Sequence, residues 1–229
     1  MNADRRGLFA ALACALAVMA LLGLMRSSLA IAYLNVRFTE QVDPLSKAVS
    51  YYVFVQEEAF TGALVAVAIA TATVFVGMVQ LRVRIGVPAG LLIAVWCAAL
   101  VLCAYFPTDN SPRIETAHGL VHQIAGITLF ASFPLAGMAL AKTLRTQTHW
   151  ARTARTVRTF SWVAAGLALT YLLARLPDLL PWPGFPLDGR AISGLVQRTL
   201  FALEVGLVGV LGWRLFHISW RTTRREVPA

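Results

Sequence analysis

Three residues near the middle of the chain have side chains that can bind a metal ion. His118 and His122 are one helical turn apart, so on a helix they project from one face, at a spacing that lets two imidazoles share a metal. Asp109 precedes them and can complete such a site or hydrogen-bond one imidazole. The segment permits two interpretations. One is a divalent-metal site, such as zinc, formed by His118, His122 and Asp109, and the other is a histidine pair that only satisfies a helix start.

Five further polar residues fall inside apolar stretches. A carboxylate there is unfavourable unless it is paired, protonated or facing a wet cavity, so Glu57 and Glu58 are candidate catalytic groups. Arg198, with Gln197 and Glu204, is a candidate for holding the anionic or polar head of a substrate. The alternative for Arg198 and Glu204 is a structural ion network that fixes helix register.

The composition indicates which elements position these residues. Hydrophobic residues make up 58% and charged residues 14% of the chain, against about 45–50% and about 25% in ordinary soluble domains. The apolar residues form stretches of about 20 or more, enough to cross a hydrocarbon core of roughly 30 Å. We therefore predict an all-α, polytopic transmembrane bundle, one membrane domain over residues 1–229. The expected helices cover approximately 8–34, 51–80, 86–106, 116–141, 159–176 and 193–217.

Basic residues predict the orientation of this bundle. Most Lys and Arg residues precede the first stretch, follow the last, or fall between the second and third and between the fourth and fifth stretches. Because these residues are retained in the cytoplasm, both termini are expected there, in a bacterial inner (plasma) membrane. A basic rim facing anionic lipid headgroups accounts for the net charge of +9, so membrane lipids and not nucleic acid are the expected partners.

Four short motifs resemble a known family. They are Asp43-Pro44-Leu45-Ser46, Phe106-Pro107-Thr108-Asp109, Thr116 with His118-Gly119 and His122, and Gly194 with Gln197-Arg198. In order and spacing they look like the bacterial membrane family catalogued as domain of unknown function 998. The resemblance implies a six-helix bundle without an established activity. The chain departs from the family in the segment 49–60, where Glu57 and Glu58 stand in place of a Gly- and aromatic-rich helix start, and this departure suggests a specialised activity.

The same residue types are also similar to the ceramidase and adiponectin-receptor-like membrane hydrolases, in which histidines and an aspartate hold zinc and a bound water attacks a lipid amide. That similarity implies His118, His122 and Asp109 as ligands, with Glu57 or Glu58 as general base and Arg198 as headgroup clamp. In a variant without metal, protonated Asp109 or Glu57 acts as general acid on an apolar substrate such as a polyprenyl chain.

A non-enzymatic function is the alternative. A bundle with an acidic outer mouth can bind lipid, support a partner membrane protein, or pass a proton or small cation by way of Glu57, Glu58 and Glu204. The absence of an obvious internal repeat disfavours a secondary transporter. We predict an outward-facing polar pocket and favour an enzyme acting on a lipid-like substrate slightly over a binding or accessory role. The expected pocket residues are Glu57, Glu58, Asp109, His118, His122 and Arg198.

Overall fold

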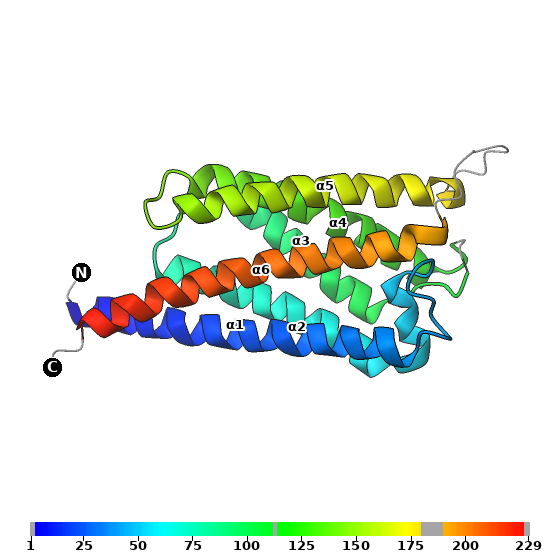
Figure 1. Cartoon of the computed structure of the whole chain (residues 1–229), viewed down its shortest axis with the longest axis horizontal. Coiled ribbons are helices and arrows are strands. Elements are labelled where there is room, and N and C mark those ends of the chain that lie inside the picture. The colour runs from blue at the N-terminus through cyan, green and yellow to red at the C-terminus, as the bar shows by residue number, and fades with distance from the viewer. Residues whose placement is uncertain (1–2, 112–113, 180–189, 227–229) are drawn as a thin grey trace.

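The structure, a computed structural model, describes residues 3–111, 114–179 and 190–226 (Figure 1). Within these ranges the chain is helical and contains no strand. The elements are α1 (Ala3–Arg37), the 3₁₀ turn η1 (Val49–Tyr52), α2 (Val53–Gln80), α3 (Val87–Tyr105), α4 (Ala117–Leu144), α5 (Ala151–Leu179) and α6 (Arg190–Glu226). Six of the described helices are long and apolar enough to cross a membrane. The predicted class is confirmed, and the chain is an all-α, multi-pass membrane protein.

The six helices form a closed bundle. Each helix packs against its neighbours in the sequence, and α6 returns to pack against α1. The helices run along the long axis of the molecule, and both termini lie at the same end (Figure 1). We call this the termini end. The opposite end carries residues 38–48, 106–111 and 114–116 and is called the far end.

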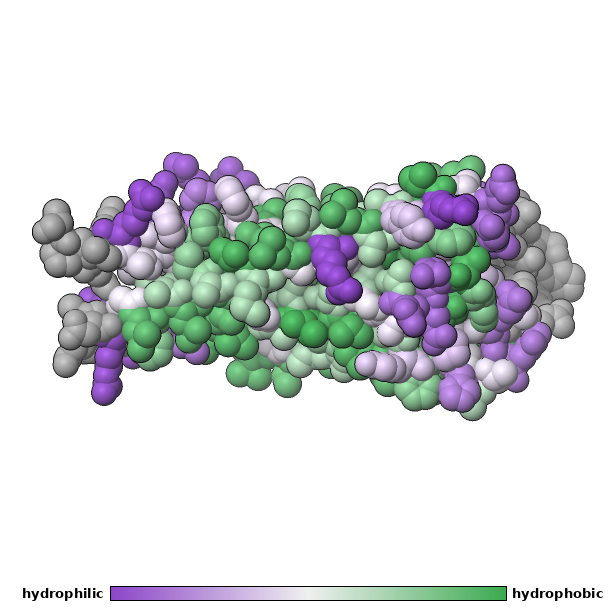
Figure 2. All heavy atoms as spheres, turned by 90° about the horizontal axis from the view of Figure 1, so that it is seen from below, coloured by the Kyte–Doolittle hydropathy of each residue, from purple (hydrophilic) through white to green (hydrophobic). Residues whose placement is uncertain are grey.

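The surface of the bundle carries an apolar band between two polar ends (Figure 2). Large hydrophobic side chains in this band, such as Met25, Leu91 and Leu169, are more than half exposed. Apolar surface of this extent needs lipid to cover it. Arg26, near the middle of α1, is also exposed, and in a bilayer its long side chain must reach toward the headgroups.

Small residues let α1 approach its neighbours closely. Ala10, Ala13, Ala17 and Ala20 recur every three or four positions, and all four are buried. In a membrane, where water does not drive helices together, such stripes allow the tight van der Waals packing that holds a bundle. Deeper in the core, Trp96 is fully buried and its ring packs against Phe133, with 4.5 Å between ring centroids.

The helices agree with the predicted stretches in order and centre but often extend beyond them. The fifth helix was expected from residue 159 and begins at Ala151, and the sixth was expected to end at residue 217 and continues to Glu226. Hydropathy marks only the part of a helix that lies in lipid. Arginine is a good helix former, so Arg-rich turns continue the backbone hydrogen bonding outside the membrane.

The start of α2 differs from the expectation in a way that affects the candidate site. Gln56 has non-helical backbone angles (φ −155°, ψ 72°), which break the helix soon after it begins. Glu57 and Glu58 follow this break directly and are exposed. They therefore lie at the beginning of the regular helix, not two turns inside it as their positions in the apolar stretch suggested.

Candidate functional site

The carboxylate of Asp109 organises the connection between α3 and α4. It accepts hydrogen bonds from the backbone N–H of Glu115 at 2.8 Å and from the hydroxyl of Thr116 at 2.7 Å. Thr116 in turn caps α4, because its hydroxyl oxygen accepts from the backbone N–H of Gly119 at 3.0 Å. The donors from Thr116 and Glu115 hold the pKa of the Asp109 carboxyl below its usual value. The expectation that Thr116 opens this helix is confirmed.

Gly119 is required by the same arrangement. A Cβ atom at this position would overlap the carboxylate of Asp109. The absence of a side chain at Gly119 therefore allows Asp109 to reach the first turn of α4. The His-Gly pair at 118–119 thus has a packing explanation that does not depend on chemistry at His118.

The two histidines lie beside this connection and contact the same residue. His122 is buried, and its Nδ1 lies 2.7 Å from the carbonyl oxygen of Phe106. Because a carbonyl only accepts, Nδ1 carries the proton in this contact. His118 is exposed, and its ring packs on that of Phe106 with 5.6 Å between centroids.

The described residues include no group of three or more His, Cys, Asp or Glu side chains placed to hold a metal ion. The ligand set proposed from the sequence, His118, His122 and Asp109, is therefore brought into one region but not assembled around one point. The physical reason is that the oxygens of Asp109 are directed at Glu115 and Thr116, where they complete the start of α4.

Arg198 forms the second polar centre of the far end. Its Nε–H donates to Asn35 at 2.7 Å, and its Nη1 donates to the carbonyl oxygens of Pro44 at 2.9 Å and Lys47 at 2.5 Å. The guanidinium also lies over the ring of Tyr52, 5.5 Å from the centroid. Arg198 thereby joins α6 to α1, η1 and the connection 38–48. Its acceptors are neutral oxygens, and no ion pair joins it to a carboxylate of the described residues.

The neighbouring motif residues hold the same connection in place. Asp43 accepts from the hydroxyl and the backbone N–H of Ser46 and from the backbone N–H of Leu45. The hydroxyl of Ser46, followed by the N–H of Leu45, lowers the pKa of the Asp43 carboxyl. The connection is thereby folded into a compact turn that presents its carbonyl oxygens to α6.

On α6, Gly194 and Gln197 complete this contact. A Cβ atom at Gly194 would overlap the carbonyl oxygen of Lys47, so the connection can pack on α6 only where the side chain is absent. The Oε1 atom of Gln197 accepts from the backbone N–H of Val49 at 2.7 Å. We call Asp43, Gly194, Gln197 and Arg198, with the backbone they bind, the Arg198 cluster.

The remaining predicted residues do not join either centre. Glu204 is buried, and its Oε2 accepts from the indole N–H of Trp96 at 3.3 Å, while its Oε1 has no hydrogen-bond partner among the described residues. Glu57 and Glu58 make no hydrogen bond or ion pair with a described residue. The candidate site residues are thus divided between the connection around Asp109, the Arg198 cluster, the core and the exposed start of α2.

A groove between α1 and α6 was not anticipated from the sequence. It has a volume of about 450 Å³, and apolar side chains such as Leu24, Ile31 and Phe201 line most of it. Polar groups also line it, among them Asn35 and Arg198. The small residues of α6, Ala202, Gly206 and Gly209, form one wall. Their spacing is the one sequence signal for this groove.

The chain matches, over residues 27–214, the model of a family described as "Protein of unknown function (DUF998)". That range contains Asp109 with its partners, the Arg198 cluster and most of the α1/α6 groove, whose residues Leu21, Leu24 and Met25 precede it. No curated protein and no solved structure matches the chain.

Proposed function

We propose a lipid-binding function for this chain, which belongs to the DUF998 family of proteins of unknown function. The proposed site is the α1/α6 groove, with a lipid chain between the two helices and the lipid headgroup near Asn35 and Arg198. The observation that carries the proposal is the distribution of polarity in the groove. Most of its lining is apolar, apart from Ser27 and Ser28 on α1, and Asn35 and Arg198 lie toward the far end, so it matches an amphipathic molecule.

The length of the groove supports a lipid of one leaflet. From Arg198 to Gly209 the lining follows α6 for about 16 Å at 1.5 Å per residue. A leaflet is half of a hydrocarbon core of roughly 30 Å. A chain that starts at Arg198 therefore reaches about the middle of the membrane at Gly209.

The charge of Arg198 supports an anionic headgroup. The side chain donates to neutral oxygens of Asn35, Pro44 and Lys47, which satisfy its N–H groups but do not cancel its charge. A nearby phosphate or carboxylate is attracted by the remaining positive charge. The positive charge of Arg198 also helps to lower the pKa of the Asp43 carboxyl, but no ion pair joins the two side chains.

Lipid binding has more support than lipid hydrolysis. The hydrolase hypothesis needs Asp109 and the two histidines at one reacting centre, and the Asp109 oxygens complete the start of α4 instead. The groove contains Arg198 but none of Asp109, His118 or His122. The non-enzymatic alternative is therefore the function that these contacts favour.

We also propose that the chain is a single membrane domain with its termini in the cytoplasm of a bacterial cell. Basic residues of the connections at 82–84 and 142–158 support this orientation, since they lie at the same end as the termini. The groove then opens to the outer leaflet. An alkaline phosphatase fused to the C-terminus, which is active only outside the cytoplasm, is expected to be inactive, and an active fusion would reverse the assignment.

Filling the groove tests the function. Gly206 and Gly209 line the groove, and a Cβ atom at either position has no neighbour closer than 4.0 Å, so the Gly206→Leu, Gly209→Leu variant adds bulk to the groove wall. Native mass spectrometry of protein extracted from membranes is expected to detect one retained phospholipid per chain, reduced roughly tenfold in the variant.

The matched control is Gly166→Leu on α5, where a Cβ atom has no neighbour within 4 Å and the position does not line the groove. This variant should retain lipid as the native protein does. Equal retention by the native protein and the filled variant would refute lipid binding in the groove.

A further inference from the structure

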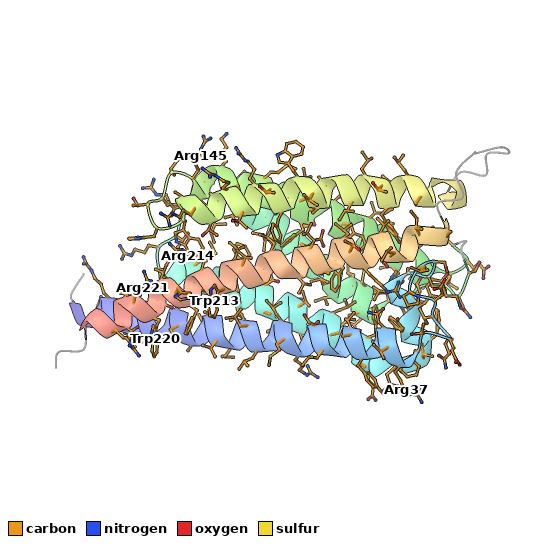
Figure 3. All side chains as sticks on the ribbon, in the orientation of Figure 1. Arg37, Arg145, Trp213, Arg214, Trp220 and Arg221 are labelled. Carbon is orange, nitrogen blue, oxygen red and sulfur yellow. The ribbon has the colours of Figure 1, made fainter. Side chains whose placement is uncertain are left out.

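A pocket at the termini end gathers positive charge from several parts of the chain. It has a volume of about 400 Å³ and is lined by Arg6 of α1, Arg82 after α2, and Arg214 and Arg221 of α6. His149 and His217 add two imidazoles, and the described residues of the lining include no Asp or Glu. We call it the basic pocket. Figure 3 shows Arg214 and Arg221 on the part of α6 that runs toward the termini.

Arg82, which lines this pocket, has an unusual backbone conformation. Its φ is +56°, in the left-handed region that favours glycine. The N–H of Arg82 bonds the carbonyl of Val79 at 2.8 Å and the N–H of Val83 bonds that of Met78 at 2.9 Å. This is the Schellman ending of a helix, in which glycine usually occupies the position of Arg82. An arginine is present where the backbone disfavours it, and such strain is concentrated at functional positions.

The wall of the basic pocket is fixed by Arg214. Its Nε–H donates to the carbonyl oxygen of His149 at 3.1 Å, and its Nη2 contacts the same oxygen. This contact joins α6 to the connection between α4 and α5. Arg214 and His149 are thereby held together in the lining, while one guanidinium edge is engaged with a neutral acceptor that leaves the charge intact.

Membrane orientation alone does not account for this arrangement. The orientation signal requires Lys and Arg near the cytoplasmic ends of helices but not their convergence in one hollow. A second basic hollow, lined by Lys142, Arg145, Arg155 and Arg158, is formed by α4, α5 and their connection alone. The basic pocket instead draws on α1, the end of α2, the α4–α5 connection and α6. Like charges brought together in this way repel one another unless an anion neutralises them.

We infer that the basic pocket binds a phosphate group. Guanidinium groups donate in pairs to phosphate oxygens, and imidazoles add further donors. The phosphate can belong to the headgroup of an anionic phospholipid in the adjacent leaflet or to a soluble phosphate compound. This site is at the opposite end from the α1/α6 groove, and the inference stands whether or not the groove binds lipid.

One substitution separates an effect on phosphate binding from an effect on folding. Arg82→Gly removes a cation from the pocket and places glycine where the Schellman turn favours it, so the fold is retained or strengthened. The matched control is Arg84→Gln, which loses the same charge from the same connection. Arg84 is exposed and does not line the pocket.

Two binding measurements distinguish the sources of phosphate. In the first, inorganic pyrophosphate is titrated into protein in an uncharged maltoside detergent, with chloride at equal ionic strength as reference. In the second, nanodiscs of phosphatidylcholine are compared with nanodiscs that also contain phosphatidylglycerol, and the lipid retained by the protein is measured. Saturable pyrophosphate binding identifies a soluble compound, and enrichment of phosphatidylglycerol identifies a headgroup.

In either measurement, binding is expected to weaken about tenfold in Arg82→Gly and by less than about twofold in Arg84→Gln. The thermal midpoint of Arg82→Gly should equal or exceed that of the native protein, which excludes unfolding as the cause. Absence of saturable binding in both measurements, or an equal loss in the two variants, would overturn the inference.

Discussion

The two ends of the bundle use charged residues in different ways. At the far end, Asp109 is bound by Thr116 and Glu115, and Arg198 is bound by Asn35 and backbone carbonyls. At the termini end, arginines and histidines converge in a pocket whose described lining includes no Asp or Glu. The comparison teaches that the residue types most suggestive of catalysis build the far-end connections, whereas the cations that converge from several helices lie at the other end.

The largest expected effect is at Gly194, where α6 and the connection 38–48 are in direct backbone contact. In Gly194→Ala, the new methyl overlaps the carbonyl oxygen of Lys47 and lies 2.9 Å from that of Leu45, so one backbone must move. We expect a loss of stability of about 3 kcal/mol or failure to fold, measured as the thermal midpoint in detergent. Gly126→Ala is the control, because its Cβ meets no atom within 4 Å. An equal midpoint for both variants would contradict the tight contact.

The next largest loss of stability tests whether Arg198 organises the far end through the hydrogen bonds of its planar guanidinium or through its charge. Arg198→Lys keeps the charge but loses the planar fork that reaches Asn35, Pro44 and Lys47 together. The partly buried acceptors of Asn35 and Pro44 lose their donor, and the expected loss of stability is about 2 kcal/mol. If lysine restores the native thermal midpoint, charge and not the hydrogen-bonded fork organises the far end.

A smaller change, and a gain of stability instead of a loss, is expected at the termini end. Arg82→Gly relieves the left-handed conformation (φ +56°) and should stabilise the protein by about 1 kcal/mol. Differential scanning calorimetry in detergent measures the gain. Destabilisation by this change would mean that the Arg82 side chain contributes more to folding than its backbone conformation costs, and would remove the contrast between the two ends.

The smallest effect at neutral pH concerns Asp109. Its pKa is lowered in the folded state from an ordinary value of 3.8, so the stability that it contributes is present above about pH 4 and is lost as the pH falls through the folded pKa. Asp109→Asn has no charge and only one acceptor oxygen in place of the two that bind Glu115 and Thr116, so it should be slightly less stable than the native protein at pH 7, and this difference in thermal midpoint should shrink below about pH 4. An unchanged acid profile in this variant would assign the acid sensitivity to other carboxyls.

The length and apolar content of the six stretches predicted the bundle well, because a helix that crosses the hydrocarbon core needs both. Six stretches were expected and six described helices are long and apolar enough to span a membrane. The extensions of α5 to Ala151 and of α6 to Glu226 were missed because arginine ends an apolar stretch without ending a helix. The break at Gln56 carries no Gly or Pro, so no sequence signal corrected the depth assigned to Glu57 and Glu58.

The site was harder to predict because its contacts depend on backbone atoms. Asp109, Thr116 and Arg198 were all identified from the sequence, yet their partners are amides and carbonyls of connections whose paths composition does not specify. The start of α4 at Thr116 was predicted because the beginning of an apolar stretch is a local feature of the sequence. The left-handed Arg82 had no signal, since glycine is the residue that usually marks such a turn.

Photolabelling tests the central claim, lipid between α1 and α6, most directly. Membranes containing the protein are labelled with a phosphatidylglycerol that carries a diazirine in its acyl chain, and the modified peptides are identified. The account predicts label concentrated on the groove segments 24–35 and 201–209, and lost in the Gly206→Leu, Gly209→Leu variant. Label distributed evenly over exposed apolar faces, including Trp162 and Leu169 of α5, would contradict it.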